Sequence, residues 1–230
     1  MTDDRVCTYC GLTENLTNDH VPPKCLFLSP RPTDLITVPA CKECNNAFSK
    51  DDEFFRALVA IQADAAGNRV GQRIWDEKVI ASTMKRSPAL KRDLAKGITT
   101  VEVRSYSGLY LGKSPALPFP KKRINRVVER IVRGLLWHHY RIKPGPAIHF
   151  QIRMDPEIGD IPFSFESHAN LSSVGGTVFQ YRHNTAIEDP EQSIWLLRFY
   201  STTTFLVLLI REDSANDGRN VSSMLAQRVL

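Results

Sequence analysis

The chain has no long hydrophobic run and no leader-like start. Its longest apolar stretch, from Phe205 to Ile210, is far shorter than the roughly 20 residues that a membrane-crossing helix needs. The first residues, Met1 to Arg5, are polar and partly acidic, unlike a secretory signal peptide. We therefore expect a cytoplasmic protein without a membrane segment, in which cysteine thiols stay reduced.

Internal repeats and low-complexity segments are also lacking, and neither sign of charge dominates. The 230 residues are 42% hydrophobic and 24% charged, which is typical of a globular protein with an apolar core. The net charge of +5 permits a polyanionic partner without requiring one. Composition therefore leaves the function class open, and the motifs must decide it.

Cysteine is scarce, but four of the five cysteines form two CxxC pairs, Cys7 with Cys10 and Cys41 with Cys44. Each CxxC turn presents two thiolates, so two such turns can complete a tetrahedral site for one Zn²⁺. A zinc ion would also fold a short polar segment that is too small to bury a core of its own. The fifth cysteine, Cys25, is expected to be a small buried apolar side chain.

Patterns of apolar residues predict a first part, residues 1–66, that contains two short strands followed by a helix. The helix is expected to begin near Asn45 or Ser49 and to end near Ala66. Acidic side chains in its first turns suit the positive end of the helix dipole and are expected to be solvated: Asp51, Asp52 and Glu53.

The second part, residues 67–230, is predicted to be helical over about 68–145, with a hairpin near 101–111 that interrupts the helices. Strands are predicted over about 147–211, namely 148–154, 176–182 and 193–210, the last long enough for two strands broken near 201–202, and one short helix is expected in the tail. The clearest helix of this part runs from about Lys121 to Tyr140 and has a broad apolar face. Basic residues follow one side of this helix: Lys121, Lys122, Arg123, Arg126, Arg130 and Arg133. They suit either a nucleic-acid backbone or a solvated face. The whole chain is thus predicted to be α+β.

The remaining histidines give weaker signals. His138 and His139 are adjacent on the predicted helix and should point apart, so they are expected to be core or surface side chains, not a second metal site. His183 lies in a predicted strand and receives no role.

A polar motif lies between the two CxxC pairs. Asp19-His20 is followed by Val21-Pro22, and Asn45 comes directly after the second pair. This arrangement resembles the HNH endonucleases, whose fold is a treble-clef-like ββα-metal finger. The resemblance covers about residues 7–56, roughly a quarter of the chain.

The resemblance implies two metal sites with different roles. A structural Zn²⁺ would be held by Cys7, Cys10, Cys41 and Cys44, and a catalytic Mg²⁺ or Mn²⁺ by Asp19 and Asn45. His20 takes the position of the general base. Asn46 is the alternative ligand to Asn45. The middle residue of the family motif has no clear equivalent, and Asp34 is the nearest polar candidate, which departs from the usual asparagine.

These residue types fit hydrolysis of a phosphodiester bond. Carboxylate and amide oxygens favour Mg²⁺ or Mn²⁺, whereas thiolates favour Zn²⁺. An imidazole with a pKa near 6.5 is largely deprotonated at neutral pH, as a general base must be. We therefore expect an endonuclease acting on nucleic acid, by resemblance DNA, in phage defence, restriction or a mobile element. The rival hypothesis is a non-catalytic zinc module that binds nucleic acid or protein. Residues 67–230 could bind a protein partner.

Overall fold

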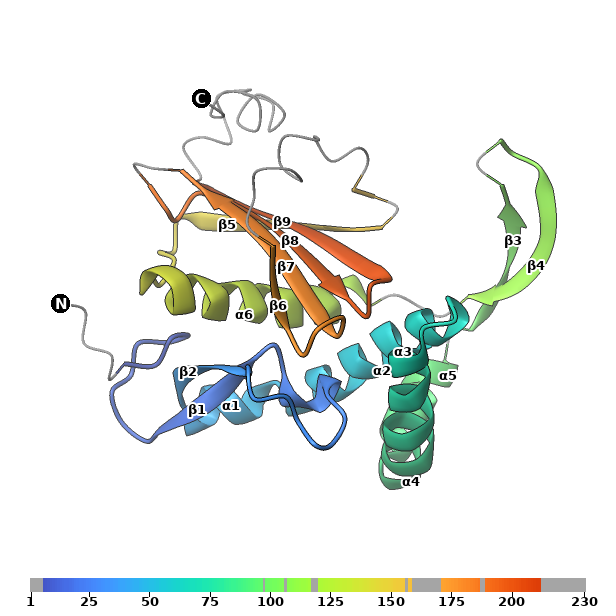
Figure 1. Cartoon of the computed structure of the whole chain (residues 1–230), viewed down its shortest axis with the longest axis horizontal. Helices are drawn as coiled ribbons and strands as arrows, with labels where there is room; N and C mark the ends of the chain where they lie inside the picture. Colours follow the sequence, from blue (N-terminus) through green and yellow to red (C-terminus); the bar gives the residue numbers. More distant parts are fainter. Residues whose placement is uncertain are drawn as a thin grey trace.

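The chain is a mixed α+β protein built in layers (Figure 1). The structure is a computed structural model, and it describes residues 6–96, 98–105, 107–116, 120–155, 157–158, 171–186 and 189–211. A five-stranded sheet forms one layer, two long helices form the next, and a small cysteine-bracketed module forms the third. None of the helices in these ranges is long and apolar enough to cross a membrane.

The N-terminal module has the predicted order of strand, strand and helix. Strands β1 (Leu16–Val21) and β2 (Ile36–Cys41) form an antiparallel ribbon, and the short 3₁₀ helix η1 (Lys24–Leu26) lies in the loop between them. Helix α1 (Lys42–Ala47) follows β2 without a linker, because Cys41 caps it. Helix α2 (Ser49–Ala65) comes next, so the single predicted helix is two helices, the first beginning three residues early.

The middle of the chain is a helical segment and a strand pair. Helix α3 (Arg69–Arg73), the π-helix η2 (Ile74–Thr83) and α4 (Met84–Arg86) run as one continuous helical stretch, as predicted, and α5 (Pro88–Ala95) follows them. Gly71 lets α3 approach α2 closely, since a Cβ there would collide with the Ala63 side chain. Strands β3 (Thr99–Arg104) and β4 (Tyr110–Ala116) then form the predicted hairpin, which projects from the body (Figure 1).

The C-terminal sheet is antiparallel throughout, with strand order β5-β9-β8-β7-β6. Its strands are β5 (Ile148–Met154), β6 (Leu171–Val174), β7 (Phe179–Thr185), β8 (Ser193–Phe199) and β9 (Thr203–Arg211). The predicted strands over 148–154 and 193–210 are confirmed. The predicted strand over 176–182 begins too early, because Gly175 and Gly176 adopt positive φ and form the β6–β7 turn. The predicted tail helix lies outside the described residues.

Helix α6 (Lys121–Tyr140), which has the predicted bounds, joins the other two layers. One buried cluster includes side chains of β1, of α6 and of the sheet, for example Val21, Ile131 and Trp195. Gly134 brings α6 against β1, since a Cβ there would lie 2.5 Å from Val21 Cγ2. The apolar core therefore continues across the predicted boundary at residue 66.

Candidate functional site: a cysteine cluster beside a polar strand

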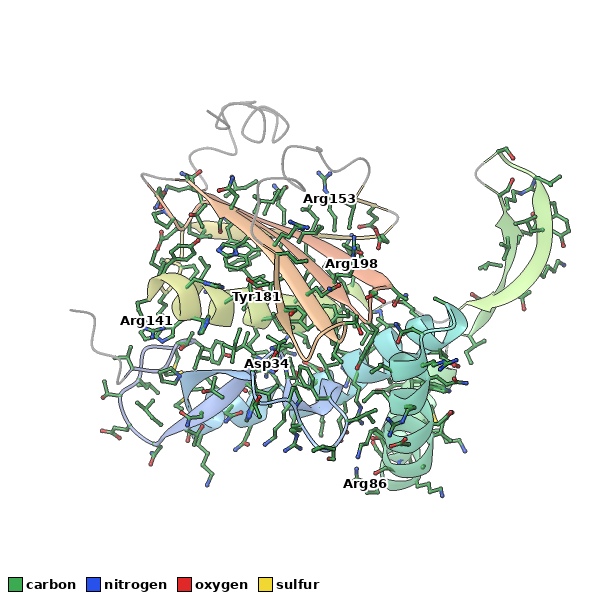
Figure 2. All side chains as sticks on the ribbon, in the orientation of Figure 1. Asp34, Arg86, Arg141, Arg153, Tyr181 and Arg198 are labelled. Atoms are coloured by element: carbon green, nitrogen blue, oxygen red, sulfur yellow. The ribbon has the colours of Figure 1, made fainter. Side chains whose placement is uncertain are left out.

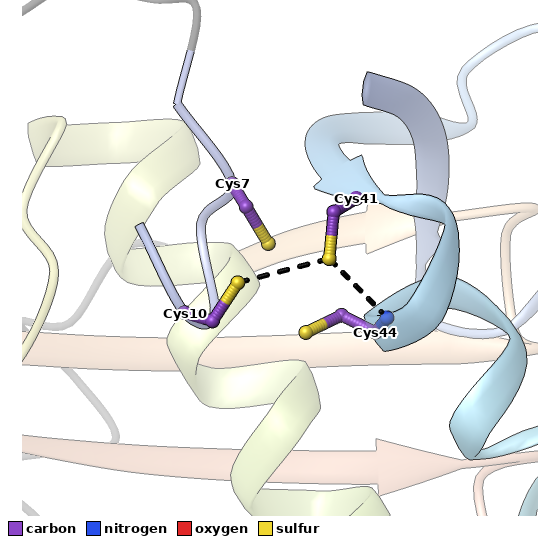
Figure 3. A group of neighbouring side chains, drawn as sticks. All are labelled: Cys7, Cys10, Cys41 and Cys44. Atoms are coloured by element: carbon purple, nitrogen blue, oxygen red, sulfur yellow. Dashed lines mark hydrogen bonds between the residues drawn. The ribbon is translucent and has the colours of Figure 1, made fainter. Parts of the chain in front are cut away.

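The four predicted cysteines converge on one point (Figure 3). Their sulfur atoms all lie within 4.8 Å of one another, and Cys10 Sγ is 3.7 Å from Cys41 Sγ. Four sulfurs placed tetrahedrally at about 2.3 Å from one zinc ion would be about 3.8 Å apart. The cluster therefore has the donor set and the spacing of a structural zinc site.

Backbone hydrogen bonds shape the two cysteine turns. In the first turn, the N–H of Gly11 donates to Cys7 O at 2.8 Å, and Gly11 has a φ of 85°, a conformation that glycine adopts without strain. In the second turn, Cys41 Sγ accepts the N–H of Cys44 at the start of α1. The N–H of Thr8 donates to Pro39 O and ties the turns together. The two local turns and the hydrogen bond between them thus bring the four sulfur atoms together.

Electrostatics favour a thiolate at Cys7. Burial opposes ionisation of this thiol, but the backbone N–H groups of Cys10, Cys41 and Tyr9 together lower its pKa to about 7. Burial and the nearby sulfurs of Cys41 and Cys10 raise the pKa of Cys44. Four sulfurs at this spacing cannot all be ionised unless a cation balances them, which is what a divalent metal does.

Asp19 lies on the buried side of β1, among charged and polar partners. Its side chain is 7% exposed. The hydroxyl of Tyr9 donates to Asp19 Oδ2 at 2.7 Å, and the backbone N–H of His20 donates to Oδ1 at 2.8 Å. Arg130 Nε lies 3.8 Å from Oδ2. The carboxylate is therefore fixed in place by three neighbours.

Asn45 reaches from α1 back to β1. Its Nδ2 donates to Thr17 Oγ1 at 2.9 Å and to Asn18 O at 3.4 Å. Alternate residues of a strand share a face, so Thr17 and Asp19 are on the same face of β1. Asn45 is thus positioned on the Asp19 side of the ribbon, with its Oδ1 not used in these bonds. Asn46, the alternative ligand, is exposed on α1.

His20 is partly buried, and its position in β1 directs its side chain to the face opposite Asp19. Burial, then the positive charge of Lys24, lower its pKa below the usual value, while Asp19 acts in the opposite sense and Arg31 adds to the lowering. The imidazole is therefore neutral at pH 7. Lys24 and Arg31 are both exposed, which makes the surroundings of His20 positive.

Asp34, the candidate for the middle position of the motif, contacts a distant part of the chain. Its carboxylate accepts the backbone N–H of Gly175, at 3.0 Å from Oδ2 and 3.2 Å from Oδ1. Figure 2 shows Asp34 at the junction between the N-terminal module and the C-terminal sheet. These bonds attach the β1–β2 loop to the β6–β7 turn.

The basic side of α6 faces the start of α2. Arg123 Nε donates to Asp51 Oδ1 at 2.6 Å, and Arg126 Nη1 lies 3.1 Å from Asp51 Oδ2. Arg130 Nη2 donates to both oxygens of Asp52 at 2.9 Å. The prediction that Asp51 and Asp52 are solvated is wrong, because these arginines bury both carboxylates. Arg123 and Arg130 are thus largely enclosed by their carboxylate partners, whereas Arg126 is paired but remains 56% exposed.

Cys25 lies outside the metal cluster, as expected. Its thiol contacts the carbonyl oxygen of Asp52 at 3.6 Å, and burial raises its pKa to about 12. The residue as a whole is only partly buried, but its sulfur is a protonated, inward-facing group with a packing role.

Two histidine–tyrosine pairs at the end of α6 were not predicted from the sequence. His139 Nε2 and Tyr181 Oη are 2.9 Å apart, and His183 Nε2 and Tyr140 Oη are 2.8 Å apart. The His183 ring stacks on Trp195 with 4.4 Å between centroids. Alternation in β7 places Tyr181 and His183 on one face, but their pairing with α6 depends on how that helix crosses the sheet.

Among the residues that the structure describes, the four cysteines form the one group of three or more His, Cys, Asp or Glu side chains that converges to metal-binding distance. Comparison of the chain with protein-family models, with curated proteins and with solved structures gave no significant match.

Proposed function

We propose that the protein is a metal-dependent endonuclease of the HNH type that hydrolyses phosphodiester bonds, with DNA as the substrate. The observation that carries the proposal is the hydrogen bond from Asn45, the residue directly after the second CxxC pair, to Thr17 in β1. This bond places an amide side chain beside the strand that contains Asp19 and His20. A zinc ion at the four cysteines would hold α1 and β1 in this relation.

The oxygen donors fit a hard divalent cation. Each Asp19 oxygen uses one position for a hydrogen bond and retains another, and the Nδ2 bonds of Asn45 leave its Oδ1 available. Asp19 and Asn45 would hold Mg²⁺ or Mn²⁺, which when bound stabilises negative charge on a phosphate and on the departing oxygen. The contact with Arg130, whose Nε lies 3.8 Å from Asp19 Oδ2, helps to orient the Asp19 carboxylate.

His20 would act as the general base on a water that reaches it around the edge of β1, since its side chain and that of Asp19 are directed to opposite faces of the strand. Its lowered pKa keeps the imidazole neutral near pH 7, so it can accept a proton from an attacking water. Lys24 and Arg31 would attract the phosphodiester toward the base, because both are exposed and their charges act on His20. Expected products are a 5′-phosphate and a 3′-hydroxyl.

A second candidate is a non-catalytic zinc module that binds nucleic acid or protein. The observation in its favour is the enclosure of Asp19, which is 7% exposed and bonded to Tyr9 and to the His20 backbone. In that case Asp19 would serve only to join β1 to α6 through Arg130.

The deciding experiment is plasmid cleavage by the purified full chain in Mg²⁺ or Mn²⁺. We expect the parent to nick the plasmid and His20→Ala to be slower by about 10²- to 10⁴-fold, the usual contribution of a general base. His138→Ala is the matched control, since His138 is an exposed histidine at the far end of α6. Full activity in His20→Ala would remove His20 from the mechanism. No cleavage by the folded, zinc-loaded parent would favour the binding module.

A further inference from the structure

The positive charge of this chain is concentrated in one place. Residues 69–96, which form α3, η2, α4 and α5, are called here the basic helical segment. They contain eight Lys or Arg and three Asp or Glu, a net charge of +5. The whole chain also has a net charge of +5, so the rest of the sequence is neutral overall.

Most of this charge is exposed and has no ion-pair partner among the described residues. Two of the three acidic residues are already paired, Glu77 with Arg73 and Asp93 with Arg123 of α6. The exposed basic side chains that remain are Arg69, Lys85, Arg86, Lys91, Arg92 and Lys96. By contrast, Arg123, Arg126 and Arg130 of α6 are each held by a carboxylate of α2. The chain thus balances its charges at the helix contact but not on the basic helical segment.

The basic helical segment projects from the body on the side of the N-terminal module. In Figure 1 the helix from α3 to α4 extends past that module, away from the five-stranded sheet. In Figure 2, Arg86 lies at the far end of this projection, whereas Arg153 and Arg198 lie on the sheet at the other side of the molecule. The unpaired charge is therefore on the same side as the module that contains His20.

We propose that the basic helical segment is the surface that binds the phosphate backbone of duplex DNA. The inference deepens the proposed nuclease function, because it names where that site's substrate is held. Crowded cations repel one another, and a polyanion relieves the repulsion while releasing its own condensed counterions. Contacts of this kind go to phosphates and are independent of base sequence. The paired arginines of α6 take no part.

The test is equilibrium binding in the full-length His20→Ala background, which does not depend on cleavage. Fluorescence anisotropy with a labelled DNA duplex of about 30 base pairs is measured over a salt series. Arg86→Glu/Arg92→Glu is compared with Arg153→Glu/Arg198→Glu. All four arginines are exposed, and the two double variants have the same net charge.

We expect Arg86→Glu/Arg92→Glu to weaken binding at least about tenfold and to reduce the salt slope by about 2, one for each lost phosphate contact. The sheet variant should bind within about twofold of its parent. Equal losses in both variants would show that only net charge matters and would overturn the proposal, as would no loss in either.

Failure of this inference can be told apart from failure of the proposed function. Plasmid cleavage by the parent, together with unchanged DNA binding by Arg86→Glu/Arg92→Glu, would keep the nuclease and reject this surface. A selective loss of binding in that variant, with no cleavage by the parent, would keep the surface and reject the nuclease. Circular dichroism of each variant verifies that folding is unchanged.

Discussion

Arg130 Nη2 donates to both carboxylate oxygens of Asp52 at 2.9 Å, and this ion pair joins α6 to the start of α2. The Arg130 side chain is 3% exposed. Burial opposes its charge, but the carboxylates of Asp52 and then Asp19 overcome that effect and raise its pKa. Its guanidinium also lies 4.7 Å from the centre of the Phe48 ring. One buried cation thus connects β1, α2 and α6 behind the proposed site.

Arg130→Met should destabilise the protein by about 3–5 kcal/mol, because it leaves two largely buried carboxylates without their cation. Urea unfolding at pH 7 measures the loss. Arg126→Met is the control, since Arg126 is 56% exposed and its pair with Asp51 should contribute about 1 kcal/mol or less. Equal losses in the two variants would contradict a special role for the buried pair.

Cys41→Ser should abolish zinc binding and unfold the N-terminal module. Structural zinc contributes on the order of 10 kcal/mol of folding free energy in finger peptides, and three ligands hold it far less tightly than four. Zinc content by elemental analysis and limited proteolysis of the full chain report the two effects. Cys25→Ser is the matched variant and should retain one zinc ion, because Cys25 lies outside the cluster. Zinc retained by Cys41→Ser would rule out the four-cysteine site.

Asn45→Ala should lower the nicking rate by at least about tenfold, since it removes both a predicted metal ligand and the bond to Thr17. Asn46→Ala should keep the parental rate, because its side chain is exposed on α1. The assay is plasmid nicking over a range of Mg²⁺ or Mn²⁺ concentrations, where loss of a ligand raises the metal requirement. The opposite ranking of the two variants would assign the ligand to Asn46.

Acidification should destabilise the junction between α6 and the sheet through His183. Burial, and then the neighbouring His139, lower the pKa of His183 to about 4. Between pH 6.5 and 4 the unfolded chain binds a proton that the folded chain does not, so the free energy of unfolding decreases as the pH falls, by at most about 3 kcal/mol.

Urea unfolding at pH 7.5 and pH 5 measures this dependence, and His183→Phe isolates the contribution of the histidine. The variant keeps the stacking on Trp195 and loses the bond to Tyr140. Its stability should change less with pH than that of the parent. The same pH dependence in both proteins would show that His183 does not carry the effect.

The elements that the sequence predicted well are those whose signal is local. The broad apolar face predicted α6 with the bounds that it has. The cysteine cluster was predictable because each CxxC turn is a local structure and zinc has a fixed geometry. The β6–β7 turn was misplaced, because either glycine of Gly175-Gly176 fits a strand end as well as a turn.

The charged residues of α2 and α6 show where sequence reasoning failed. Asp51 and Asp52 are at the start of a helix, where acidic side chains are favoured with or without a partner. Arg123 and Arg130 lie beside an apolar stripe, where solvated side chains are common. Nothing in either segment indicates that the two helices cross at these positions, more than seventy residues apart in the sequence.

The sequence alone determined the four thiol ligands, the polar motif between them, and the order of the N-terminal module, because short turns and strand alternation depend on neighbouring residues. Tertiary structure decided which charges are free. Packing of α6 on α2 pairs the arginines at that contact with carboxylates, whereas most cations of the basic helical segment have no ion-pair partner in the part of the chain that the structure describes. Ion pairs form between side chains that meet in space, whatever their separation along the chain.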